Sequence, residues 1–369
     1  MTLFEFCLPF IIFFFFLYMV LRLKGISHWF LPYLGHQLKN FFTPSEFPQN
    51  IYFCIVDHFE PKFDSVVPMS ALNEWCHRWP TIAERHSDWR GVHPKHTFFL
   101  PIEQYNGEAW RLLAEMCHKG YGDVEIHLHH NDDSSENLMR VLQNKKELMF
   151  LRHGFLRKDP VTKDIVFSFI HGNWCLDNSR SDGKWCGVNN EIDILRECGC
   201  YADLTMPSGT GSTQTKTINS IYYAIDNPRR PKSHDTGISM QVGQAPPGEG
   251  LLMIQGPLAL NWKKRKFGIF PRIENGDISA NNQPTTDRID LWIKQRIRVK
   301  GDKRNIFVKV HTHGAKGNLE PLLSGYLDEM YSYLEDEYND GEKYKLFYVT
   351  PYELYNKLKC IEKGNVSEE

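Results

Sequence analysis

Neither sign of charge dominates this sequence. Its 43 Lys and Arg residues are nearly balanced by 45 Asp and Glu residues, which leaves a formal net charge of −2. Nucleic-acid-binding proteins usually present a basic face, and the short basic run at residues 263–266 is typical of a solvated turn. We therefore expect no nucleic acid among the partners of this protein.

Cysteine is too sparse and too scattered to build a disulfide framework. The nine cysteines are an odd number and extend from Cys7 to Cys360 in a chain of 369 residues, whereas disulfide-stapled domains are small and dense in cysteine. We expect buried or free thiols in a reducing compartment. The sequence also shows no internal repeat.

No lysine or arginine precedes the apolar run at residues 3–21, and no small-residue cleavage site follows it. These absences exclude a cleaved signal peptide. The run has a length that suits a bilayer and carries one charge, Glu5, so it predicts a retained transmembrane anchor over residues 1–24. Basic residues Arg22, Lys24 and Lys39 follow it, and the positive-inside rule then places the large domain in the cytoplasm.

Composition divides the rest of the chain. Residues 25–48 are rich in aromatic side chains and are expected to form a juxtamembrane linker. A single α/β domain is expected over residues 49–360, with an irregular insertion at about 229–282 that is rich in Pro, Gly and basic residues, and a tail over 361–369. The anchor makes membrane lipid an expected partner.

Apolar runs alternate with amphipathic stretches along the domain. Strands are expected at 51–56, 124–129, 165–170, 306–310 and 346–350, and helices at 110–118, 134–151, 190–198, 322–334 and 351–358. Such alternation implies a mainly parallel sheet. With about seven units of this kind, we predict an α/β fold: a distorted (β/α) barrel of about seven parallel strands, preceded by one N-terminal transmembrane helix.

Polar side chains follow four of the expected strands. In parallel barrels the functional residues gather at the carboxyl ends of the strands, and the residues at those ends here are Asp57, His58 and Glu60; His129, His130, Asp132 and Asp133; His171, Asn173 and Asp177; and His311 and His313. Strand alternation also places His127 on the same face as His129. We expect the barrel to bring these side chains together.

This mixture of imidazoles and carboxylates is typical of a metal hydrolase. Zn²⁺ takes His and carboxylate ligands and keeps one position for water, and the ion acidifies that water and polarises the carbonyl under attack. A carboxylate serves as base and a histidine as acid. The sequence therefore predicts a divalent metal, zinc above others, as cofactor.

The order of these motifs resembles the polysaccharide deacetylase superfamily (NodB-homology fold), over roughly residues 51–356. The segments that carry the resemblance are Ile-Val-Asp-His at 55–58, Glu-Ile-His-Leu-His at 125–129 and Val-His-Thr-His-Gly at 310–314. As a divergent member, the protein is implied to remove acyl groups, chiefly acetyl, from N-acetylhexosamine residues of a saccharide, such as a lipid-linked glycan or an exopolysaccharide precursor.

The resemblance also implies roles for single residues. In the first motif, Asp57 is the base and His58 a metal ligand, or Asp57 is itself the ligand. In the second motif His129 stands in the place of the first metal histidine. The place of the second is taken by Asp133, and either Asp133 or His127 completes the metal site.

The last two motifs leave further choices open. Either His311 or His313 is the acid in the final motif. The family's Arg-Pro-Pro-type third motif is absent, and its place is taken by residues 169–174 followed by 177–179. We expect His171, Asn173, Trp174 and Asp177 to bind substrate.

Two other functions remain open at this point. A metallo-phosphoesterase or amidohydrolase also uses His-x-His pairs, although usually on the first strand. The first motif of the family ends in two adjacent acids, whereas here Asp57 is followed by His58. A non-catalytic barrel that binds glycan or scaffolds a membrane complex would account for this missing second acid. Metal binding separates the enzymes from the scaffold, and the hydrolysed group separates the two kinds of enzyme.

Overall fold

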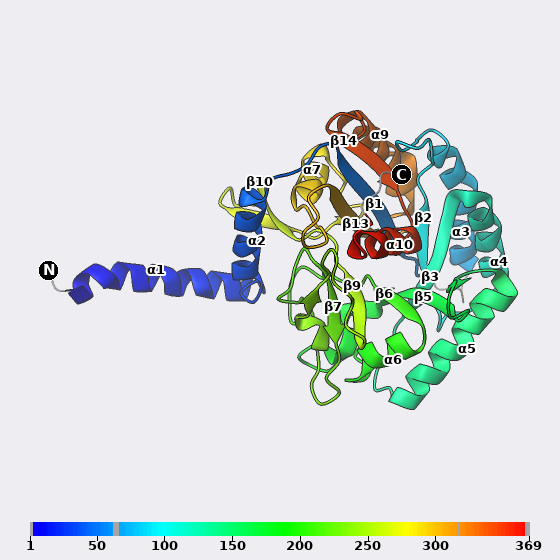
Figure 1. Ribbon diagram of the computed structural model, residues 1–369, viewed down its shortest axis with the longest axis horizontal. Helices are drawn as coiled ribbons and strands as arrows, with labels where there is room; N and C mark the ends of the chain where they lie inside the picture. The colour runs from blue at the N-terminus through cyan, green and yellow to red at the C-terminus, as the bar shows by residue number, and fades with distance from the viewer. Residues whose placement is uncertain (1–2, 62–65, 316, 366–369) are drawn as a thin grey trace.

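The computed structural model describes residues 3–61, 66–315 and 317–365 (Figure 1). Residues 1–2 of the expected anchor and 366–369 of the expected tail lie outside the described residues. The fold is α/β with a mostly parallel central sheet. Seven strands follow one another through parallel pairings, in the order β13 (Asn305–Thr312), β1 (Gln49–His58), β2 (His96–Pro101), β3 (Gly122–Leu128), β5 (Ile165–His171), β6 (Cys200–Asp203) and β9 (Gly250–Ile254).

Shorter strands extend this sheet at both edges. The parallel strand β12 (Asp277–Ile278) flanks β13, while β7 (Ile221–Ile225) and β8 (Ile238–Ser239) add antiparallel pairs beyond β9. Strand β14 (Tyr344–Tyr348) pairs with the first half of β1, and β4 (Arg157–Lys158) pairs with β5. Strands β10 (Ala259–Lys266) and β11 (Phe270–Glu274) form a separate hairpin. Within the described ranges the strand path runs open from β12 to β8.

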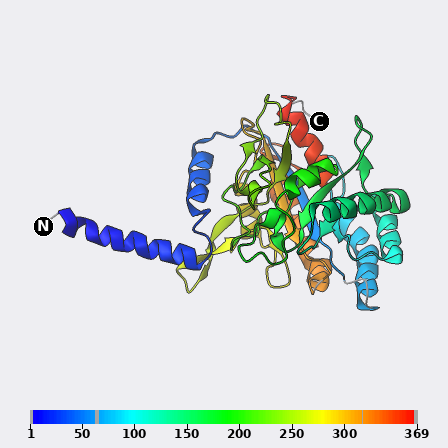
Figure 2. The same cartoon turned by 90° about the horizontal axis from the view of Figure 1, so that it is seen from below.

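Helices surround the sheet on the sides seen in Figures 1 and 2. They are α3 (Val66–Ala83), α4 (Gly107–Met116), α5 (Ser135–His153), α6 (Glu191–Glu197), α7 (Thr286–Lys294), α9 (Leu327–Tyr338) and α10 (Pro351–Glu362), with the short turn α8 (Leu319–Pro321) before α9. Local sequence fixes several ends: Ser134 caps the start of α5. Gly154 ends α5 in the left-handed conformation at φ 67°, and Thr350 with Glu353 forms a capping box on α10.

The two faces of the sheet pack against different partners. Along β1, residues 51, 53 and 55 belong to a cluster with the outer helices α3, α4 and α9. Residues 52, 54 and 56 belong to a second cluster with β6, β9, β13 and α10. The buried Lys309 on β13 donates to the carbonyl oxygens of Leu204 and Met206 after β6. Since β13 and β6 are far apart in the strand order, this contact shows that the sheet is curled. We call the second face the inner face.

The expected transmembrane anchor is wrong. Residues Leu3–Leu23 form helix α1, which projects from the body in Figures 1 and 2, but no helix in the described part of the chain is long and apolar enough to cross a membrane. Glu5 and Pro9 interrupt the apolar run, and at its other end Leu21 packs on the protein beside Trp29. Three further predictions rested on this anchor and are not supported without it: the single-pass location, the cytoplasmic orientation and the lipid partner.

The segment after α1 packs on the domain as helix α2 (Phe30–Phe42). Trp29 and Tyr33 are buried with Leu258 and Leu260, and the Trp29 indole N–H donates to the Gly209 carbonyl oxygen at 3.1 Å. Residues 229–282 contain a strand of the main sheet, β9, as well as the β10–β11 hairpin. All cysteines with a described side chain are free thiols.

Candidate metal centre

Histidines from three strands meet on the inner face at the carboxyl end of the sheet. His58 ends β1, His127 lies on β3 with His129 just beyond it, and His311 lies on β13 with His313 just beyond it. The His58 ring centroid lies 4.7 Å from that of His313, 5.1 Å from that of His127 and 5.8 Å from that of His311. The expected convergence of strand ends therefore occurs, and the sheet's curvature produces it.

Three ligand atoms face one another within this group. The Glu60 carboxylate, two residues beyond the end of β1, places Oε1 3.3 Å from His127 Nε2 and 3.5 Å from His129 Nε2. A tetrahedral zinc ion with bonds of about 2.0–2.1 Å holds its ligand atoms about 3.3–3.4 Å apart. The spacing and the donor types of Glu60, His127 and His129 thus fit a zinc ion.

The other nitrogen of each imidazole is already engaged. His127 Nδ1 lies 2.8 Å from the Ile170 carbonyl oxygen, and His129 Nδ1 lies 2.8 Å from Glu103 Oε1. Both partners only accept hydrogen bonds, so each Nδ1–H donates and the Nε2 atom of each ring faces Glu60. This is the arrangement of metal-binding histidines, whose outer N–H is held by a carbonyl or a carboxylate.

Electrostatics favour the neutral, ligating form of the buried rings. Burial, with His129 nearby, lowers the pKa of His127 to about 3. Burial also holds the pKa of His58 well below its usual range, and the neighbouring His313 adds to the effect. His127 and His58 are therefore held in the neutral form, which is the form that binds a metal ion.

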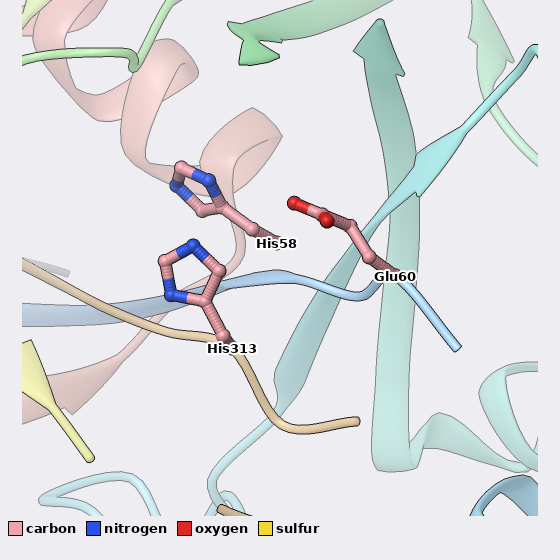
Figure 3. A group of neighbouring side chains, drawn as sticks. All are labelled: His58, Glu60 and His313. Atoms are coloured by element: carbon pink, nitrogen blue, oxygen red, sulfur yellow. The ribbon is translucent and has the colours of Figure 1, made fainter. Parts of the chain in front are cut away.

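Glu60 belongs to a second group as well. One ligand atom each from His58, Glu60 and His313 lie within 4.8 Å of one another. Figure 3 shows the His58 and His313 rings side by side, with the Glu60 carboxylate directed toward them. The carboxylate is thus flanked by imidazoles on two sides, and ligands for more than one ion are within reach.

Asp57 lies apart from this group. Alternation along β1 turns it to the outer face, where Oδ2 lies 2.8 Å from His96 Nε2 and Oδ1 accepts from the Gly314 backbone N–H at 2.7 Å. A methyl group on Gly314 would meet Oδ2 at 2.2 Å, which requires glycine at that position. Asp57 thereby fixes the segment that immediately follows His313.

Asp133 and His171 also lie outside the group, in a second cluster. Asp133 Oδ2 lies 2.9 Å from His130 Nδ1, and His130 Nε2 lies 2.8 Å from His171 Nε2. Glu191, the first residue of α6, completes this cluster. Asp133 is thus a partner of a histidine that the sequence analysis left without a role.

Of the remaining expected substrate-binding residues, Trp174 is nearest the inner face. Its ring centroid lies 5.9 Å from that of His58 and 6.1 Å from that of His313, and its buried indole N–H has no hydrogen-bond partner among the described residues. Asn173 precedes it in a left-handed conformation. Asp177 is buried, its Oδ2 accepts from the Ser233 backbone N–H at 2.6 Å, and burial raises its pKa to about 8.

Three carboxylates of these clusters had no ligand or supporting role in the sequence analysis. Glu60 stands in the polar segment after β1, and its place beside His58 was the available signal. Glu103 stands two residues beyond β2, a strand that was not predicted. Glu191 opens a helix that was predicted, but nothing local relates it to His130 or His171. Long-range folding alone brings the last two into place.

Comparison with known proteins adds little. No family model matches the sequence, and no curated protein matches it. Among solved structures, the chain is similar to one described as a "putative polysaccharide deacetylase" from Mycobacterium smegmatis, at 13% identity and a TM-score of 0.47, over 86% of this chain and 94% of that one. We base no assignment on a likeness of this level.

Proposed function

We propose that this protein is a metal-dependent hydrolase that removes an acyl group from a saccharide. The observation that carries the proposal is the convergence of Glu60 Oε1 with the Nε2 atoms of His127 and His129, each ring held by its outer N–H. The acyl-saccharide part of the proposal rests on the order of the motifs at residues 55–58, 125–129 and 310–314.

In this proposal Glu60, His127 and His129 hold a zinc ion. A zinc ion so held would acidify a water molecule and polarise the acyl carbonyl. Glu103 orients His129 through the Nδ1–H bond. His58, which is buried, and His313, which is half-buried, lie beside Glu60, where either ring can take a proton from the attacking water and pass it to the leaving amine or alcohol.

Asp57 has a positioning role in this proposal. Its two oxygens are engaged by His96 and Gly314, so it anchors the backbone just beyond His313. In place of the expected role as base or metal ligand, we propose that Asp57 acts indirectly, by holding the backbone next to His313. Trp174, which is half-buried beside His58, offers an aromatic face to a sugar ring.

The test is acetyl release from N-acetylated chitooligosaccharides by the full-length protein loaded with zinc. We expect activity in the natural protein and its loss in the His127→Ala/His129→Ala double variant. The control is His118→Ala, because the His118 ring contacts the Gly154 carbonyl oxygen instead of this group. Activity that survives in the double variant would refute the proposed centre.

A metallo-phosphoesterase is the second candidate, and one observation favours it. Glu60 is shared between the His127–His129 group and the His58–His313 group, and a carboxylate shared between ions is typical of two-metal phosphoesterases. Hydrolysis of bis-p-nitrophenyl phosphate in place of acetyl release, lost in the same double variant, would select this candidate.

A further inference from the structure

A second set of buried ligand atoms lies on the outer face of the sheet. His130 follows β3, His171 ends β5 and Glu191 begins α6, so three elements contribute. The side chains of His130, His171 and Glu191 are 7%, 0% and 0% exposed. Helix α6 packs into the outer cluster, and the His171 ring contacts Phe169 of that cluster, which separates this set from Glu60, His127 and His129.

The three ligand atoms are spaced for one ion. His130 Nε2 lies 2.8 Å from His171 Nε2 and 3.2 Å from Glu191 Oε1, while His171 Nε2 lies 3.5 Å from Glu191 Oε1. Tetrahedral zinc spaces its ligand atoms by about 3.3–3.4 Å. Only the contact between the two nitrogens must open, by about 0.5 Å, to reach that geometry.

The outer nitrogens of both rings are held by acceptors. His130 Nδ1 lies 2.9 Å from Asp133 Oδ2, and His171 Nδ1 lies 2.6 Å from the Gly172 carbonyl oxygen. Each Nδ1–H therefore donates outward, which leaves both Nε2 atoms and a Glu191 carboxylate oxygen directed at one point. Such an arrangement requires a positive species between the three atoms.

Glu191 has no basic side chain to balance it. Within the described ranges its ion-pair partners are His130 and His171 alone, with no Lys or Arg, and its Oε2 accepts from the Asp177 backbone N–H at 2.6 Å. A fully buried carboxylate needs a positive partner. That partner is either a proton shared by the two imidazoles or a metal ion.

We infer that His130, His171 and Glu191 form a second divalent-cation site, with zinc as the cation that suits two imidazoles and one carboxylate. The ligand set shares no residue with the proposed catalytic centre, so the inference does not depend on the proposed function. His234 is also fully buried, and neither of its ring nitrogens has a hydrogen-bond partner among the described residues.

The site has a structural consequence for the loop that carries Trp174. His171 stands at the start of this loop, and Glu191 holds the backbone N–H of Asp177 near its end. Asn173, Trp174 and Asp177 all have φ between 53° and 57°, a conformation that costs free energy in non-glycine residues and persists where its surroundings enforce it. A cation that joins His171 to Glu191 would stabilise this loop at both ends.

The test counts zinc in the full-length protein by mass spectrometry after zinc loading and exhaustive dialysis. Glu191→Gln removes the ligand charge at nearly constant size, and the exposed Glu197→Gln on the same helix is its control. Glu60→Gln reports on the other centre. The second readout is the thermal unfolding midpoint, measured with and without zinc in the Glu60→Gln variant, in which the proposed catalytic centre has lost a ligand and the second site is intact.

We expect Glu191→Gln to contain one zinc ion fewer than the natural protein and Glu197→Gln to contain the same number. Zinc should raise the unfolding midpoint of Glu60→Gln but not that of the Glu60→Gln/Glu191→Gln variant. Should Glu191→Gln not fold, His130→Asn replaces it in the same comparison.

The outcomes separate the two centres. Zinc content unchanged in Glu191→Gln and His130→Asn would overturn the inference and leave a proton shared between the imidazoles as the positive species. Zinc lost in Glu191→Gln but unchanged in Glu60→Gln would uphold the inference and refute the proposed catalytic centre. A natural protein without zinc after loading would overturn both.

Discussion

Removing the Glu103 carboxylate is predicted to weaken zinc binding without removing a ligand. Glu103 Oε1 lies 2.8 Å from His129 Nδ1 and is the carboxylate that orients this ring. The corresponding acceptor for His127 is the backbone carbonyl of Ile170, which no side-chain substitution deletes. Glu103 is thus the position at which outer support of the centre can be tested alone.

The size of the expected loss in zinc affinity follows from how exposed the Glu103 and His129 side chains are. Loss of an outer partner of a metal-binding histidine typically costs 10- to 100-fold in metal affinity. The side chains of Glu103 and His129 are each 28% exposed, so water can replace part of the interaction and solvent screens the charge. We therefore expect Glu103→Ala to lose about tenfold in affinity, which corresponds to about 1.4 kcal/mol.

The assay is competition between the full-length protein and a chromophoric chelator for zinc. Glu103→Gln keeps an acceptor without the charge and should lie between the natural protein and Glu103→Ala. Glu108→Ala, an exposed carboxylate at the start of α4, should match the natural protein. An affinity of Glu103→Ala within twofold of the natural value would refute the argument from the Nδ1–H bond.

Three further predictions concern stability and the fit of the centre. Arg288 is 1% exposed and its guanidinium contacts both Glu274 oxygens, so Arg288→Met leaves a buried carboxylate without its cation. Urea unfolding should show that the free energy of unfolding falls by about 3–5 kcal/mol. Adding Glu274→Gln should recover part of this loss, and no recovery would contradict the charge argument. A methyl group on Gly172 would meet His129 Cδ2 at 2.2 Å, so Gly172→Ala should displace that ring and lower zinc affinity in the chelator assay; unchanged affinity would show that the ring is not held there. Burial raises the pKa of Asp203 to about 7, so the folded state binds more protons than the unfolded state between pH about 4 and 7, and stability falls as pH rises through that window. Denaturant unfolding from pH 5 to 8 should show a smaller fall in the free energy of unfolding for Asp203→Asn than for the natural protein. An equal fall in both would refute the raised pKa of Asp203.

The sequence was informative where a buried run ends in polar residues. Residues 51–56, 165–170 and 306–310 predicted β1, β5 and β13, because buried parallel strands are largely apolar, and the alternation of apolar and polar residues over 124–129 predicted β3. Period-two alternation correctly placed His127 and His129 on one face. The mostly parallel sheet and the gathering of histidines at its carboxyl end followed from these strands.

The same alternation, applied to β1, would have separated Asp57 from His58. The motif comparison treated the two as neighbours in one centre, whereas adjacent residues of a strand point to opposite faces, and Asp57 contacts His96 instead. Strand β9 was not predicted, because Gly250–Ile254 lies among the Pro and Gly residues of 229–282. The pairing of Glu191 with His130 depends on packing between α6 and the sheet, which no local pattern encodes.

The anchor prediction failed for a related reason. The length of the apolar run at residues 3–21 and its single charge, Glu5, were taken as sufficient for a membrane span. Among the described residues, no helix meets the length and apolarity that a span needs. Local composition therefore predicted a helix at this position but not its relation to a membrane.

The most direct test of the central claim is the zinc content of the full-length protein beside its His127→Ala/His129→Ala variant, measured by mass spectrometry after zinc loading and dialysis. The account predicts that the double variant contains one zinc ion fewer than the natural protein, while His118→Ala contains the same number. Equal zinc content in the natural protein and the double variant would contradict a metal centre at Glu60, His127 and His129, and with it the proposed hydrolase.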